Sequence, residues 1–264
     1  MDNFILLAII SGIGIAFITG LLGCFVVWKK MAYFGESLGH SAVLGIGIGL
    51  LLGIGDNIAV LLVIITFSLI VTYLQNKEAF SNDLILAVLA HGLLSIGIIL
   101  ISINPDPNFN LHSFLFGDIL TVSLNEIFLI FLSAIFIYLI ILTNWKALLI
   151  TIISKDLAKS QNINNFKIEL LFTFTMALAV AISIKIIGAL LITSMLIIPS
   201  SCAKQLVNNP KNMVIISIII SILSILIGIL CSYYFDIPSG PAIILTSFSA
   251  FFIINLLKSK KLVD

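Results

Sequence analysis

The segment GCFVVWKKMAYFGESLGHSAVLG, residues 23–45, joins the end of one long apolar stretch to the start of the next. Lys29 and Lys30 stand at the junction, and Glu36 and His40 follow inside the second stretch. Apolar stretches of about 17 to 25 residues are long enough to cross the hydrocarbon core of a bilayer. The segment therefore predicts two membrane-spanning helices, the second of which carries an acid and a histidine.

The composition of the whole chain favours the same class of protein. Of the 264 residues, 61% are hydrophobic and 9% are charged, and the mean hydropathy is +1.27. A soluble chain of this length needs more polar surface than 13 basic and 12 acidic residues supply. The three cysteines lie far apart without CxxC spacing, which indicates neither a disulfide framework nor a thiolate metal site. We predict an all-α polytopic membrane protein that forms a single transmembrane domain over residues 1–264.

The apolar runs divide the chain into nine predicted spans. Only SIKIIG separates the sixth from the seventh, so the count becomes eight if residues 168–203 form one long or broken helix. The nine predicted spans are Phe4–Trp28, Met31–Gly55, Ile58–Leu74, Leu84–Ile103, Ile127–Trp145, Ile168–Ile184, Ile186–Ala203, Met213–Tyr234 and Gly240–Leu257.

The lysines favour nine spans over eight. The chain contains no arginine, and short cytoplasmic loops accumulate basic residues. With nine spans and an external N-terminus, every lysine except Lys185 falls on the cytoplasmic side, whereas merging the sixth and seventh spans moves five lysines outside. We therefore expect nine spans and a cytoplasmic C-terminus.

Two loops are long enough to have a role of their own. The external loop, residues 104–126, contains no lysine and includes an apolar patch from Leu111 to Val122, which predicts a short helix at the outer interface. The cytoplasmic loop, residues 146–169, contains a mixed-charge segment from Lys155 to Asn162. A helix there would project toward a soluble partner, and an ordinary solvated connector is the alternative.

Glu36 and His40 are four residues apart, which places them on one face of a helix. If the second span begins near Met31, a rise of about 1.5 Å per residue puts His40 about 13 Å from that end, close to the middle of the bilayer. A carboxylate at that depth costs about 2.5 to 3.5 kcal/mol, so a water-filled cavity or a partner ion is expected. Both side chains are suitable ligands for a divalent transition metal. An interhelical hydrogen bond between two buried polar groups explains the spacing equally well.

Five blocks of the sequence, in order and in register, resemble the permeases of metal-importing ABC transporters, especially those of the zinc type. The first block is residues 23–45, which is similar to the second-helix region of that family. The other blocks are LAVLAHGLLSIGIIL (86–100), FLFGDILTVS (114–123), IGALLITSMLIIPSSCAK (187–204) and DIPSGPAIIL (236–245).

The resemblance implies a metal-type ABC importer permease fold with a metal site in the membrane. It assigns Glu36 and His40 to the transported ion, with glutamate here where relatives commonly have aspartate. His91 is a third ligand or relay by the same resemblance, or else a donor to a backbone carbonyl. In the external loop, His112 is a candidate to receive metal, and Asp118 either faces the entrance or caps a helix.

The resemblance also gives the cytoplasmic segment DLAKSQN, residues 156–162, the role of a coupling helix that inserts into an ATPase. Asp156, Leu157 and Ala158 match that motif, and Asn162 stands where glycine is usual. Asparagine is the next best residue for a left-handed turn. The motif is therefore expected to keep its shape.

From these residues we expect an inner-membrane permease that imports Zn²⁺ as its transported substrate, without a permanently bound cofactor. The expected partners are a second copy of the chain, a cytoplasmic ABC ATPase, a periplasmic zinc-binding protein and membrane lipid, but no nucleic acid. Mn²⁺ or Fe²⁺ import by the same family is the alternative, and a proton-coupled carrier is a weaker one because no internal hydropathy repeat is evident. The sequence lacks HExxH and GxxxxGK[ST], and we expect no enzyme activity in this chain.

Overall fold

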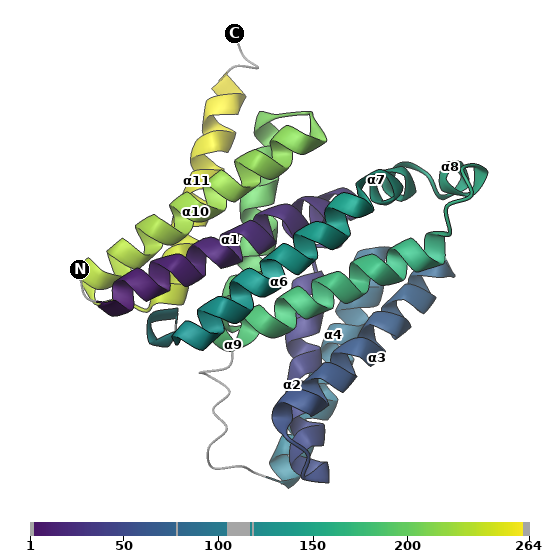
Figure 1. The fold of residues 1–264 in the computed structure, drawn as a ribbon, viewed down its shortest axis with the longest axis horizontal. Helices are drawn as coiled ribbons and strands as arrows, with labels where there is room; N and C mark the ends of the chain where they lie inside the picture. Colours follow the sequence, from purple (N-terminus) through teal and green to yellow (C-terminus); the bar gives the residue numbers. More distant parts are fainter. Residues whose placement is uncertain (1–2, 78, 105–116, 118, 261–264) are drawn as a thin grey trace. The chain divides into compact units, whose positions relative to one another are not determined.

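The computed structural model describes residues 3–77, 79–104, 117 and 119–260, and every regular element among these residues is helical. In this described part, nine stretches are long and apolar enough to cross a membrane, as the sequence predicted. The elements are α1 (Asn3–Lys29), α2 (Phe34–Leu52), α3 (Asp56–Asn76), α4 (Asn82–Ile103), η1 (Ile119–Thr121), α6 (Leu124–Thr143), α7 (Trp145–Ile153), α8 (Lys155–Ser160), α9 (Asn165–Leu206), α10 (Pro210–Phe235) and α11 (Ser239–Lys260) (Figure 1).

The sixth and seventh spans are both present, but no loop separates them. They are the segments Asn165–Ile184 and Ile187–Leu206 of α9. The helix is interrupted at Gly188, whose φ of 79° and ψ of 160° are not helical. Glycine adopts this conformation without the steric penalty that other residues incur. Pro199 also lies inside α9, and the residue with non-helical angles is Gly188.

The described helices belong to two compact units. One contains Met1–Val27, His112–Ala134 and Ile182–Asp264, and the other contains Trp28–Leu111 and Ile135–Ala181. We call them the first unit and the second unit. The long helices α1, α6 and α9 contribute residues to both, and the expectation of a single transmembrane domain stays a prediction.

Close helix contacts organise the first unit. Helices α10 and α11 pack together, and a Cβ added to Gly228 would lie 2.5 Å from the Ile243 Cα. Helix α1 approaches α10 in the same way, since a Cβ on Gly20 would lie 2.8 Å from the Ile218 Cα. Glycine at both positions allows the backbones to approach closely, as is common between membrane helices.

The second unit is built around α2, which packs against both α3 and α4. An aromatic cluster closes the start of α2: the Phe34 ring lies 6.2 Å from Phe67 of α3 and 6.4 Å from Phe172 of α9, measured between ring centroids. Phe34 and Phe172 are fully buried. The residues that position Glu36 and His40 therefore belong to a packed core.

The two long loops have different outcomes. The short helix expected from Leu111 to Val122 lies mostly outside the described residues, and the described portion includes the 3₁₀ turn η1. In the loop predicted to be cytoplasmic, α8 confirms the predicted helix, although it ends at Ser160. Helix α7, which precedes it, was not predicted, because residues 145–153 are apolar enough to resemble a continuation of the fifth span.

Candidate functional site

The second helix begins three residues later than the sequence suggested, and this changes the depth of its polar side chains. Helix α2 starts at Phe34, so His40 lies about 9 Å along it, short of its middle, and not about 13 Å as predicted. Glu36 occupies the first turn, where the positive end of the helix dipole stabilises a carboxylate. Both residues are half-buried. The cost of placing Glu36 here is therefore lower than at mid-membrane.

Hydrogen bonds near the helix ends connect α1, α2 and α4. The Tyr33 backbone N–H, just before α2, donates to the Asp83 carboxylate in the first turn of α4 at 3.2 Å. The Asn82 side chain donates to the Lys29 carbonyl oxygen at the end of α1 at 3.1 Å. These bonds help to hold α2 and α4 in register near their N-terminal ends.

That register brings His40 and His91 together. Their ring centroids are 6.3 Å apart, with a 44° angle between the ring planes. Two imidazoles that bind one zinc ion tetrahedrally, with Zn–N distances of about 2.0 to 2.1 Å, have ring centres about 5 Å apart. The observed separation is about 1 Å longer, a difference that side-chain rotation can span. The two rings can therefore share an ion after a small adjustment.

His40 has an unused nitrogen. Its Nδ1 atom is buried and has no hydrogen-bond partner within the described part of the chain. A buried polar atom without a partner costs free energy and calls for an explanation, and coordination of a transported ion would supply one. His91 is exposed, and its carbonyl accepts a hydrogen bond from the Ser95 hydroxyl at 2.8 Å. The alternative that the sequence allowed for His91, in which its ring donates to a backbone carbonyl, stays open.

The structure does not assemble a complete metal cage from the predicted ligands. Among the residues it describes, no three His, Cys, Asp or Glu side chains are grouped so that they could hold one ion. His40 and His91 form the pair, and Glu36 lies one turn from His40 on α2. His112 and Asp118 lie outside the described residues, so their predicted roles stay predictions.

Glycines set the distance between the helices that carry the two histidines. A Cβ on Gly97 of α4 would lie 2.7 Å from the Leu44 backbone nitrogen of α2, and one on Gly47 would lie 3.0 Å from the Gly97 carbonyl oxygen. Both contacts are about two turns beyond the histidines. The sequence showed many small residues in α2, but it did not show that Gly97 is their partner.

A buried ion pair at the end of α1 was not predicted. The Lys29 Nζ lies 2.8 Å from Glu169 Oε1 of α9, with only 5% and 8% of the two side chains exposed. The ammonium also lies 5.1 Å from the centre of the Phe172 ring. The sequence contained one sign of this ion pair. Glu169 is a charge just inside a predicted apolar span, and charges in such spans are usually paired.

The predicted coupling segment, residues 156–162, has well-defined ends. The Ser154 hydroxyl accepts from the Leu157 N–H at 3.3 Å and caps the start of α8. After its end, Asn162 has a φ of 56°, which confirms the left-handed turn expected there. Its N–H donates to the Lys159 carbonyl at 3.0 Å, and the Ile163 N–H donates to the Ala158 carbonyl at 2.9 Å. This is the Schellman pattern, in which asparagine takes the place of glycine.

The side chains of α8 are divided between the interior of the protein and its surroundings. Ala158 is fully buried, while Leu157 is 42% exposed and Asp156 is exposed. The segment is held by two hydrogen bonds: Lys155 Nζ donates to the Gln75 carbonyl at 3.3 Å, and the Asn165 side chain donates to the Lys155 carbonyl at 3.0 Å. An exposed leucine beside an exposed acid on an anchored helix suits contact with another protein.

Comparison with known proteins finds matches over nearly the whole chain. The family model described as "ABC 3 transport family" matches residues 1–258. The high-affinity zinc uptake system membrane protein ZnuB of Haemophilus influenzae is 35% identical over 255 residues, which is 97% of both chains. The manganese import system permease protein ScaB of Streptococcus parasanguinis is 26% identical over 259 residues, covering 98% of this chain and 92% of the relative.

A solved structure, that of PsaBC from Streptococcus pneumoniae in complex with Fab, contains a chain with a similar fold. It superposes with a TM-score of 0.82 at 27% identity and covers 96% of this chain and 91% of the other. Nine apolar spans, the ordered sequence blocks and matches over nearly the full length lead to one conclusion: the chain belongs to the ABC 3 transport family.

Proposed function

We propose that this chain is the multi-pass inner-membrane permease of an ABC importer that carries Zn²⁺ into the cell. The principal support is its 35% identity with a zinc uptake membrane protein, compared with 26% for the manganese permease. The adjacent imidazoles of His40 and His91 support the same cargo, since imidazole suits zinc better than manganese.

In this proposal the ion enters from outside and is held by few protein ligands. His40 and His91 supply imidazole nitrogens, Glu36 supplies a carboxylate near the cytoplasmic end of α2, and water completes the coordination. Four protein ligands would retain zinc as a structural site does. Transport requires binding weak enough for release, and a site with two imidazoles and one nearby acid satisfies that requirement.

The energy comes from a separate cytoplasmic ATPase, because the sequence has no phosphate-binding loop of the GxxxxGK[ST] type. Helix α8 is the proposed contact, with Asp156 and Leu157 exposed to the ATPase and Asn162 ending the helix. A second copy of the permease and an external zinc-binding protein complete the proposed importer.

The cargo is tested by metal uptake into vesicles that contain the full importer, with Zn²⁺ and Mn²⁺ supplied separately and in competition. We expect His40→Ala and Glu36→Gln to lower the zinc uptake rate at least tenfold, because the first removes an imidazole ligand and the second removes the negative charge of the carboxylate. Ser95→Ala is the matched control: its hydroxyl bonds only to its own helix in the described structure, one turn from His91. Wild-type uptake in both variants, with normal assembly, would eliminate the proposed site. A preference for Mn²⁺ in the wild type would eliminate the proposed cargo.

The ATPase contact is tested by co-purification. Leu157→Ser is expected to reduce recovery of the ATPase with the permease, because it removes an exposed apolar side chain from the proposed contact. Asn162→Gly should leave recovery unchanged, since glycine adopts the same left-handed turn. Full ATPase recovery with Leu157→Ser would place the contact elsewhere.

A further inference from the structure

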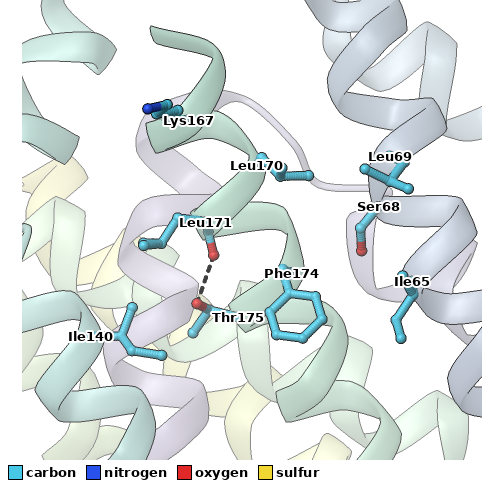
Figure 2. A pocket seen from close by; sticks show the side chains of 9 residues that line it. All are labelled: Ile65, Ser68, Leu69, Ile140, Lys167, Leu170, Leu171, Phe174 and Thr175. Carbon is cyan, nitrogen blue, oxygen red and sulfur yellow. Dashed lines mark hydrogen bonds between the residues drawn. The ribbon is translucent and has the colours of Figure 1, made fainter. Parts of the chain in front are cut away.

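An apolar groove lies in the second unit between α3, α6 and α9, away from the histidine pair. Its volume is about 440 Å³, within the range of about 300 to 1,000 Å³ that is usual for small-molecule sites. Figure 2 shows Lys167 at one end, with Phe174 and Ile65 farther along. The lining residues are Ile65, Ser68, Leu69, Ile140, Lys167, Leu170, Leu171, Phe174 and Thr175.

The two hydroxyl groups along this groove already donate their protons to their own helices. The Ser68 hydroxyl donates to the Ile64 carbonyl at 2.9 Å, and the Thr175 hydroxyl donates to the Leu171 carbonyl at 2.7 Å, as Figure 2 shows for the second bond. Both hydroxyls therefore satisfy their own helices. The surface between them is hydrocarbon, which suits an acyl chain and not a polar solute.

The charge at the end of the groove lies where a lipid headgroup would be. Lys167 is exposed in the first turn of α9, just after the cytoplasmic coupling segment, and it has no ion-pair partner among the residues that the structure describes. From Lys167 to Phe174 the groove extends about 10 Å along the helix, into the depth of one leaflet. Basic residues beside membrane helices on the cytoplasmic side attract anionic headgroups.

We propose that this groove binds one anionic phospholipid of the cytoplasmic leaflet, with an acyl chain along Leu69, Leu170 and Phe174 and the phosphate at Lys167. This site is separate from metal transport and depends only on the membrane orientation of the helices. The bound lipid would lie next to the segment that we propose as the ATPase contact, because α8 leads directly into α9.

The test is lipid retention by the full-length chain in nanodiscs that contain equal amounts of phosphatidylglycerol and phosphatidylethanolamine with identical acyl chains. Native mass spectrometry then measures the lipids that remain bound. The wild type is expected to retain phosphatidylglycerol preferentially. Lys167→Ala should lower the ratio of retained phosphatidylglycerol to phosphatidylethanolamine about fivefold, which corresponds to about 1 kcal/mol for one lysine at the membrane surface. Lys167→Arg should preserve the ratio.

Lys211 provides a matched control. Like Lys167, it is an exposed lysine in the first turn of a helix. The Lys211 backbone N–H donates to the Asn209 side-chain oxygen at 3.0 Å, just as the Lys167 N–H donates to that of Asn164 at 3.1 Å. Lys211 does not line the groove. Lys211→Ala should leave the lipid ratio unchanged. An equal effect of Lys167→Ala and Lys211→Ala would mean that surface charge alone is responsible, and this would overturn the proposal.

The groove itself is tested by Leu170→Trp, which fills it and should remove lipids of both headgroups. An unchanged ratio in Lys167→Ala, equal retention of both lipids by the wild type, or displacement of phosphatidylglycerol by inorganic phosphate alone would each overturn the proposal. So would a loss of dimer mass in Leu170→Trp, because a second copy of the chain would then be the occupant. The Lys167 series remains decisive if Leu170→Trp does not fold.

Discussion

At the scale of single residues, the contact between α2 and α4 depends on Gly97. The atoms that a Cβ would meet there belong to the backbone of Leu44 and Val43, which cannot rotate away as a side chain can. Gly92 is in the same helix, yet a Cβ there would meet no atom within 4 Å. Alanine substitutions at the two positions therefore distinguish the effect of close packing from the effect of helix propensity.

We expect Gly97→Ala to lower the free energy of unfolding by about 1 to 3 kcal/mol, the usual cost of overpacking. It should also reduce zinc uptake, because α2 and α4 would carry His40 and His91 apart. Gly92→Ala should leave uptake unchanged and not lower stability, since alanine favours helix. Thermal unfolding in detergent and vesicle uptake measure the two effects. Equal stability of the two variants would contradict the close contact.

The buried pair of Lys29 and Glu169 is the other feature at this scale. Both charges are almost fully removed from solvent, so neither is stable alone in this place. The second described pair, Lys159 with Asp156, has side chains that are 71% and 92% exposed. Exposed pairs of this kind contribute little to stability.

Glu169→Gln is therefore expected to destabilise the protein by about 3 to 5 kcal/mol, because the Lys29 ammonium stays buried without its counter-charge. The double variant Lys29→Met with Glu169→Leu should recover most of the loss, since no buried charge remains. Lys159→Ala should produce no measurable change. Thermal unfolding of the four proteins makes the comparison, and a double variant less stable than Glu169→Gln would contradict this explanation.

At the scale of elements, the break in α9 packs against a residue of the loop that was predicted to be external. Gly117, with a φ of 59°, lies so close to Ile187 and Gly188 that a Cβ on Gly117 would collide with their backbone. Gly117 belongs to the block 114–123 and Gly188 to the block 187–204, two of the five blocks that carried the family resemblance. The two glycines therefore meet in space, where the irregular backbone of each segment packs against that of the other.

We expect Gly188→Ala and Gly117→Ala each to cost about 1 to 3 kcal/mol, because both residues have positive φ. Gly55→Ala is the control, since Gly55 has a negative φ and no atom within 4 Å of an added Cβ. The readout is thermal unfolding together with the amount of protein recovered from membranes. Wild-type stability of Gly188→Ala would mean that α9 continues without a break.

At the scale of the whole molecule, nine spans and the lysine distribution predict which loops face the cytoplasm. The turn between α9 and α10 contains Asn209, whereas the turn between α10 and α11 contains Asp236. With an external N-terminus, the first turn is cytoplasmic and the second external.

A cysteine at position 209 should react with a membrane-impermeant maleimide only from the cytoplasmic side, and one at position 236 only from outside. The background is Cys231→Ser, because Cys24 and Cys202 are buried and Cys231 is partly exposed. Labelling of intact cells and of inside-out vesicles compares the two sides. Labelling of position 209 from outside and of position 236 from the cytoplasm would indicate eight spans, with the sixth and seventh merged, whereas labelling of both from one side would mean that α10 does not cross the membrane.

The sequence alone determined the class, the number of spans and the left-handed turn at Asn162. These follow from local properties: apolar length for the spans, and the tolerance of Asn162 for a left-handed turn. The orientation expected from the lysines depends on the whole chain and stays a prediction. The family resemblance contributed the candidate site residues, and Glu36 and His40 share one helix, so their spacing was also visible.

The tertiary structure decided what depends on distant parts of the chain. His40 meets His91 across 51 positions, Lys29 pairs with Glu169 across 140, and the groove combines α3, α6 and α9. An apolar helix in a membrane is hydrophobic on nearly every face, so periodicity does not reveal which face meets which neighbour. Backbone contacts at glycines such as Gly97 determine that choice, and they become visible only when the helices are packed.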